Sequence, residues 1–187
     1  MCYNTFKRIE QGKPMVDLIK QDYEKNKKLY DQTARSLTRE IGYDCPISHV
    51  GSTAIPNMYG KNIIDILIGA KDENEFNHLT SKISNIGYFP SSNSRTNIYQ
   101  FFASTTAETC SGDIHIHLSI IDTDRYNEFL ILKDYLLANP SEAEKYSNYK
   151  KEILALQNID RQKYREIKSK FVSALIDKAK QFSQNKQ

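Results

Sequence analysis

The chain has 187 residues, of which 39% are hydrophobic and 26% are charged, and its formal net charge at pH 7 is +3. A chain of this length is typical of one domain that buries its own core without disulfides or a structural metal. The positive excess is small and spread along the chain, so we predict no specific binding of nucleic acids.

The cysteines and the apolar runs indicate the compartment. Cys2, Cys45 and Cys110 are odd in number, lie far apart and form no CxxC motif, which favours free thiols in a reducing environment. The N-terminal residues lack the apolar stretch of a secretory signal, and the longest apolar run is interrupted by Asp65. That run is far shorter than the roughly 20 residues of a membrane span. We therefore expect a cytoplasmic protein that does not enter a membrane.

The first two thirds of the chain alternate between amphipathic helices and short β-branched runs. Leu29, Thr33, Leu37 and Ile41 fall on one helical stripe that ends at Gly42, a pattern typical of a helix packed on one side. The short apolar runs are typical of buried strands. We predict helices at residues 26–41 and 72–85, and strands at residues 15–19, 46–50, 62–68, 87–89, 98–103 and 113–121.

The last third has a purely helical pattern, interrupted by Asn139-Pro140, because proline suits the first position of a helix. We predict helices at residues 124–138, 141–157 and 160–182, with Tyr and Leu packed inward and Lys and Glu solvated on the other side. Residues 1–187 are thus predicted to form a single domain of the α/β (α+β) class. It comprises a core with a mixed sheet flanked by helices at 14–121, a helical extension at 122–182 and a polar tail at 183–187.

Candidate functional residues cluster in two neighbouring segments, HVGSTAIP at positions 49–56 and KNIIDIL at positions 61–67. Gly51 allows backbone N–H groups to approach an anion, and Ser52 and Thr53 add hydroxyl groups at the start of a short helix. Asp65 must be paired, protonated or metal-bound, since an isolated buried carboxylate is costly. A magnesium ion that links this carboxylate to a phosphate at the turn meets that need. Lys61 is either a phosphate contact or a solvated loop residue.

The two segments resemble the nucleotidyltransferase superfamily of the DNA polymerase β type, whose signature is a Gly-Ser turn followed by an acid-x-acid pair on the next strand. More closely, they resemble the GrpB family, with the patterns H-[IV]-G-S-T-A-[VI]-P and K-P-I-I-D-I. Gly87-Tyr88, Phe101-Phe102 and Asn139-Pro140 fit the same family. The resemblance implies a nucleotidyltransferase-like sheet, a bound nucleotide with magnesium, and attack of a hydroxyl on the α-phosphorus. It also suggests an accessory role, since the family is found fused to dephospho-CoA kinase.

The sequence departs from an active transferase at the second acid of the pair. Residues two apart on a strand share one face, so Leu67 stands where the superfamily has a second carboxylate beside Asp65. Leucine cannot ligate a metal, and a two-metal mechanism loses a bridging ligand. Asn62 also replaces the usual proline. These departures put nucleotidyl transfer in doubt.

A second polar face follows on the strand predicted at residues 113–121. Asp113, His115 and His117 alternate with apolar residues, so Asp113 is a candidate third carboxylate and His117 a candidate acid or base near neutral pH. The two histidines, with His49 as a third nitrogen donor, suit a zinc or manganese ion equally well. The alternative is that this face lines a solvent-filled cleft and makes structural hydrogen bonds.

Three functions remain open at this point. The first is binding of a nucleotide or other phosphate-bearing small molecule, with nucleotidyl transfer if the site is catalytic. The second is a non-catalytic ligand-binding or protein-interaction module, and the third is a hydrolase with a histidine-based metal site. The candidate catalytic residues are Asp65, Asp113 and His117; the candidate phosphate-binding residues are His49, Gly51, Ser52, Thr53 and Lys61; the candidate metal ligands are Asp65, Asp113, His115 and His117.

Overall fold

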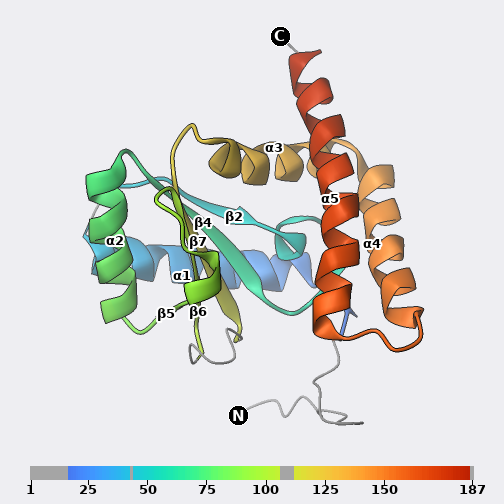
Figure 1. The fold of residues 1–187 in the computed structure, drawn as a ribbon, viewed down its shortest axis with the longest axis horizontal. Coiled ribbons are helices and arrows are strands. Elements are labelled where there is room, and N and C mark those ends of the chain that lie inside the picture. Colours follow the sequence, from blue (N-terminus) through green and yellow to red (C-terminus); the bar gives the residue numbers. More distant parts are fainter. Residues whose placement is uncertain (1–16, 43, 106–111, 186–187) are drawn as a thin grey trace.

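The structure is a computed structural model that describes residues 17–42, 44–105 and 112–185. A mixed sheet of five strands forms its centre (Figure 1). The central pair of strands is parallel, and the other neighbours are antiparallel. The strand order is β2 (Ile47–Val50), β4 (Ile64–Ala70), β7 (Ile114–Ile120), β6 (Tyr99–Ala103) and β5 (Phe89–Pro90). The predicted mixed sheet of an α+β protein is confirmed.

One face of the sheet is covered by α1 (Tyr23–Ile41) and α2 (Glu73–Asn85). The alternation of side chains along the strands sends Ile64, Ile66 and Ile68 of β4 and Ile116 and Leu118 of β7 to this face, where they pack against both helices. This is the main hydrophobic core of the described residues, and it includes Leu37, Ile41, Ile66, Phe76, Leu79, Phe102 and Ile116.

The opposite face carries the polar residues of the central strands and is covered by the C-terminal helices. Val50 and Leu67 pack there against Tyr126 of α3 (Asp124–Ala138). The next two helices, α4 (Pro140–Ala155) and α5 (Arg161–Gln184), lie side by side at one end of the sheet (Figure 1) and pack on α3. The helical extension thus stands over the polar face and leaves a hollow beside it.

Side-chain caps set the start of most helices. Asp22 accepts from a backbone N–H of the first turn of α1, and Asp72, Thr123 and Asp160 do so for α2, α3 and α5. Such caps stabilise a helix by about 1 kcal/mol. Helix α1 ends at Gly42, whose φ of 68° gives the left-handed C-cap expected there.

The predicted elements are present with shifted ends. Helix α3 has the predicted bounds, whereas α1 begins earlier than predicted because Asp22 caps it. The predicted strand at 15–19 lies partly outside the described residues, which show only β1 (Ile19–Lys20). Its partner β3 (Tyr59–Gly60) and a 3-10 helix (Ser92–Ser94) were not predicted, since elements this short have no periodicity. Within the described residues, no helix has the length and apolar character needed to cross a membrane.

Candidate functional site

Asp65 lies beside the turn that follows β2, because Val50 and Asp65 are partners in the antiparallel pair. In that turn Gly51 has a φ of 74° and a ψ of −168°, a conformation that costs any other residue about 1–3 kcal/mol. A Cβ atom at Gly51 would also come within 2.2 Å of Asp65 Oδ2. Glycine is therefore required both by the backbone and by the carboxylate, which packs directly on the turn.

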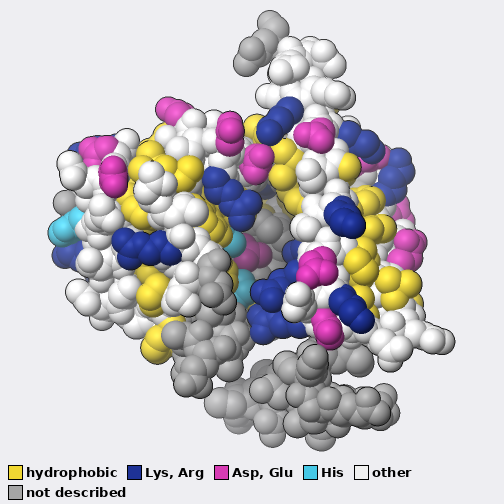
Figure 2. Space-filling view, in the orientation of Figure 1, with side chains coloured by type: hydrophobic (Ala, Val, Ile, Leu, Met, Phe, Trp, Pro, Cys, Tyr) yellow, Lys and Arg dark blue, Asp and Glu magenta, His cyan; other side chains and the backbone are white. Residues whose placement is uncertain are grey.

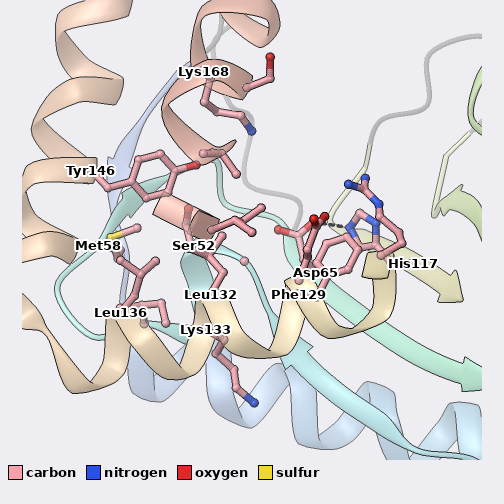
Figure 3. Close-up of a pocket in the computed structure, with 17 residues that line it drawn as sticks. Ser52, Met58, Asp65, His117, Phe129, Leu132, Lys133, Leu136, Tyr146 and Lys168 are labelled. Carbon is pink, nitrogen blue, oxygen red and sulfur yellow. Dashed lines mark hydrogen bonds and ion pairs between the residues drawn. The ribbon is translucent and has the colours of Figure 1, made fainter. Parts of the chain in front are cut away.

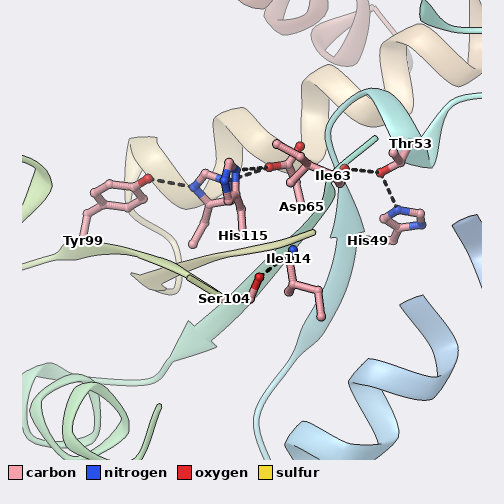
Figure 4. Close-up of polar contacts among 9 residues, drawn as sticks. His49, Thr53, Ile63, Asp65, Tyr99, Ser104, Ile114 and His115 are labelled. Atoms are coloured by element: carbon pink, nitrogen blue, oxygen red, sulfur yellow. Dashed lines mark hydrogen bonds and ion pairs between the residues drawn. The ribbon is translucent and has the colours of Figure 1, made fainter. Parts of the chain in front are cut away.

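Two histidines of β7 face this carboxylate. His115 Nδ1 and His117 Nε2 each lie 3.4 Å from Asp65 Oδ1 (Figure 4). Burial alone would raise the pKa of Asp65, but hydrogen bonds from the two histidines outweigh burial and hold this pKa well below its ordinary range. Asp65 is thus an ionised acceptor. The carboxylate that must be paired according to the sequence is thus paired with these two histidines.

Tyr99 of β6 continues the polar chain. Its hydroxyl lies 2.7 Å from His117 Nδ1, and Figure 4 shows Tyr99 and Asp65 at the two ends of the chain. Burial lowers the pKa of His117, so the ring is neutral near pH 7 and has one donor and one acceptor nitrogen. Because Nε2–H donates to Asp65, Nδ1 accepts from the tyrosine hydroxyl. The three side chains therefore hold one another in a fixed orientation.

Three lysines from different parts of the chain line a cavity of about 140 Å³ together with Ser52 and Asp65. Lys61 precedes β4, Lys150 lies on α4 and Lys168 lies on α5. Lys150 donates to Ser52 Oγ at 2.9 Å and to a backbone carbonyl of β3. Among the described residues that line this cavity, Asp65 is the sole carboxylate, so positive charge is in excess.

The lysines are held in an environment that disfavours their charge. Burial lowers the pKa of Lys150 to about 7 and that of Lys61 to about 8, and the charge of Lys168 adds to both effects. Burial also lowers the pKa of Lys168. Lys150 is 2% exposed. An anion placed among these groups would favour their charged forms.

A larger cavity of about 360 Å³ adjoins the first, and both are lined by Ser52, Asp65, Tyr146 and Lys168. Figure 3 shows Lys168 reaching from α5 toward the side of the cavity where Asp65 and His117 lie. Lys and Arg side chains gather around the hollow between the sheet and the C-terminal helices in Figure 2. The rest of the wall is largely aliphatic and includes Ile55, Met58, Leu132, Leu136, Val172 and Ile176.

Two predicted ligand-binding residues lie away from these cavities. His49 is the register partner of Ile66, so its side chain is on the face opposite Asp65, where it stacks on Tyr30 of α1 at 4.7 Å. Its Nε2 lies 3.0 Å from the hydroxyl of Thr53, which is fully buried and donates to the backbone just before β4. These contacts stabilise the Gly-Ser turn from the face of the sheet opposite Asp65. Neither residue lines a described cavity near Asp65.

The described residues do not form the expected metal centre. Asp113 is exposed just before β7 and does not line either described cavity beside Asp65. Leu67 occupies the second-acid position and is fully buried in an apolar cluster with Val50 and Tyr126. Among the described residues, no group of three or more His, Cys, Asp or Glu is arranged to hold a metal ion. These side chains do not fit a centre with two magnesium ions, which needs several carboxylates.

Lys150, Lys168 and Tyr99 were not among the site residues predicted from the sequence. Lys150 follows Tyr146 by four residues, and Lys168 follows Tyr164 by four, so both lysines share a helical stripe with a buried aromatic residue. A lysine on such a stripe is the signal that distinguishes them from the solvated lysines of the same helices. Tyr99 carried no comparable signal, because its role depends on the pairing of β6 with β7.

The fold and the site define an α+β protein with a Gly-Ser turn, a half-buried carboxylate and a lysine-lined cleft under C-terminal helices. A family model described as "GrpB protein" matches residues 16–178. The chain therefore belongs to the GrpB family, as the motifs predicted.

A curated relative and a solved structure, both named GrpB, agree with this assignment. The Glutamate-rich protein GrpB of Alkalihalophilus pseudofirmus is 31% identical over 156 residues, which are 81% of this chain and 88% of that protein. A crystal structure of the conserved protein GrpB from Enterococcus faecalis has a TM-score of 0.74 at 21% identity, over 87% of this chain and 96% of that chain. Cid1 poly (U) polymerase has a TM-score of 0.48 at 13% identity, over 71% of this chain and 43% of that chain. The Enterococcus structure shows that the fold is shared within the family.

Proposed function

We propose that this protein binds a phosphate-bearing small molecule, a nucleotide being the first to test, in the cleft between its sheet and its C-terminal helices. The observation that carries the proposal is the convergence of Lys61, Lys150 and Lys168 with Ser52 on one cavity. Buried cations are costly unless they are paired, and the one carboxylate there, Asp65, is already engaged by two histidines. A phosphate group supplies the missing negative charge and accepts several hydrogen bonds.

The larger cavity supports a ligand with an organic part. Its aliphatic wall adjoins the lysines through shared residues, Tyr146 and Lys168 among them. Binding sites for small molecules commonly combine an apolar wall with a few charged groups that fix orientation. The phosphate would then lie among the lysines, and the remainder of the ligand would lie along α3 and α5.

A thermal-shift panel tests the proposal with nucleotides, coenzyme A precursors and inorganic phosphates. A ligand at 100 times its dissociation constant stabilises a protein by about 2.7 kcal/mol, which raises the melting temperature of a domain this size by roughly 5–11 °C. Lys168→Met, which we expect to bind about tenfold more weakly, should reduce the shift to about half. Lys170→Met is the matched control, because this lysine lies on the same helix and is exposed. The proposal fails if none of the phosphates raises the melting temperature of the wild type.

Nucleotidyl transfer is a second candidate, favoured by the packing of Asp65 on the Gly51 turn at the start of the superfamily motif. Transfer would need magnesium, for which the described side chains provide Asp65 as the one carboxylate that lines the smaller cavity. Release of pyrophosphate from nucleoside triphosphates with magnesium, lost in Asp65→Asn, would support transfer. If ligands bind without release of pyrophosphate, the protein is a non-catalytic binding module.

A further inference from the structure

The balance of charge in the smaller cavity bears on how a phosphate would be neutralised. The described residues that line it include three lysines, Lys61, Lys150 and Lys168, and one carboxylate, Asp65. The lysines therefore exceed the carboxylate by two positive charges when all are ionised. A phosphate monoester carries between one and a half and two negative charges near pH 7, so it matches this excess without a further cation.

The contacts of Asp65 also favour binding of the phosphate without a metal ion. Its Oδ1 atom faces nitrogen atoms of His115 and His117, and its Oδ2 atom lies against the backbone of Gly51. Neighbours of this chain thus pair with Oδ1 and pack against Oδ2. The partner that a metal-binding carboxylate would need on the same face is Leu67, which is packed in an apolar cluster.

Lys168 extends the positive charge to the larger cavity. It lines both cavities, and its charge acts on Lys61 and Lys150. A divalent cation among these lysines would meet like charges at short range, which is unfavourable in a partly buried site.

We infer that the cleft takes its phosphate ligand as a metal-free anion, with the lysines in the place that magnesium has in nucleotidyltransferases and with Asp65 orienting His115 and His117. This inference rests on the proposed function, since it concerns the same site. Its ligand class is a phosphomonoester or diphosphate that is not chelated by magnesium. The magnesium ion expected from the sequence is replaced here by side-chain ammonium groups.

Isothermal titration calorimetry with inorganic pyrophosphate tests the inference on the full chain. Pyrophosphate binding is measured in EDTA and again with magnesium in excess over the pyrophosphate, at equal ionic strength. We expect binding in EDTA and at least about tenfold weaker binding with magnesium, because chelation cancels two of the negative charges and occupies oxygen atoms that the lysines recognise. An affinity that magnesium leaves unchanged or raises overturns the inference but leaves the proposed function intact. Absence of binding in both conditions overturns both.

Variants separate the role of the carboxylate from that of the lysines. Asp65→Asn should bind metal-free pyrophosphate more tightly, because a like charge leaves the cleft, whereas a metal-binding Asp65 would make this variant lose magnesium-dependent affinity. Lys168→Met should weaken binding about tenfold, and Lys170→Met should not. Circular dichroism confirms that each variant is folded, and the wild-type titration with magnesium remains decisive if one of them is not.

Discussion

Substitution of Gly51 by alanine tests the close packing between the turn and the carboxylate. The φ of 74° and ψ of −168° cost a non-glycine residue about 1–3 kcal/mol. The added Cβ atom would also lie 2.2 Å from Asp65 Oδ2 and 2.9 Å from its Cγ, and overpacking of this kind costs a further 1–3 kcal/mol or so. We expect a total loss of about 4 kcal/mol in the free energy of unfolding, which lowers the melting temperature by roughly 8–16 °C.

Gly42→Ala is the matched control for this experiment. Gly42 also has a positive φ, 68°, but no atom lies within 4 Å of the position of its Cβ. Its replacement should cost only the backbone strain of a left-handed residue, about 1–2 kcal/mol. Both variants are compared by differential scanning calorimetry. If Gly51→Ala unfolds at the same temperature as Gly42→Ala, the carboxylate is not held against the turn and the geometry described for Asp65 is wrong.

Three further predictions concern the polar groups of the cleft. The pKa values of Lys150 and Lys61, about 7 and about 8, lie below the ordinary value for lysine, so the affinity for pyrophosphate should fall as pH rises through this range. In calorimetry the free energy of unfolding of the ligand-free protein should instead increase with pH over the same range, because the unfolded chain binds more protons than the folded chain. Tyr99→Phe should lower the free energy of unfolding by about 1–3 kcal/mol, since His117 loses its partner at Nδ1, and an unchanged urea midpoint would contradict this. Lys150→Met should change stability by less than about 1 kcal/mol, because the release of a buried cation offsets lost hydrogen bonds, yet titration should show about tenfold weaker pyrophosphate binding.

The elements predicted best from the sequence are those in which local pattern and tertiary packing agree. The apolar run around Ile66 is polar only at Asp65, and it forms the buried strand β4 between β2 and β7. Helix α3 has its predicted bounds because Thr123 caps its start and Asn139-Pro140 ends it. Strand β3 was missed because its two residues pair with β1 through a contact that no local pattern encodes.

The candidate site was predicted in part. The predicted residues that line it are those whose side chains lie on the same face of the sheet as Asp65. Asp65, His115 and His117 converge because β4 and β7 are parallel neighbours in register, which the spacing of the two strands could suggest but not fix. His49 was grouped with them from the motif, yet its position in β2 sends it to the opposite face, against Tyr30. A motif identifies residues that a turn needs, and only the register shows which of them face the ligand.

The C-terminal helices supply what the motif segment lacks. Ser52 and Lys150 are separated by 98 residues in the chain and by 2.9 Å in the structure, and Lys168 comes from yet another helix. Without these helices, the sheet would still present the hydrogen-bonded side chains of Asp65, His117 and Tyr99. These three side chains satisfy one another's hydrogen bonds and together carry the negative charge of Asp65. Apart from Lys61, the positive charge that lines the two cavities comes from α3, α4 and α5, so the affinity proposed here for phosphate depends on how these helices dock on the sheet. Substitutions that weaken the packing of these helices on the sheet, such as those at the buried Tyr146, should therefore weaken phosphate binding even where the core formed by α1, α2 and the sheet stays folded.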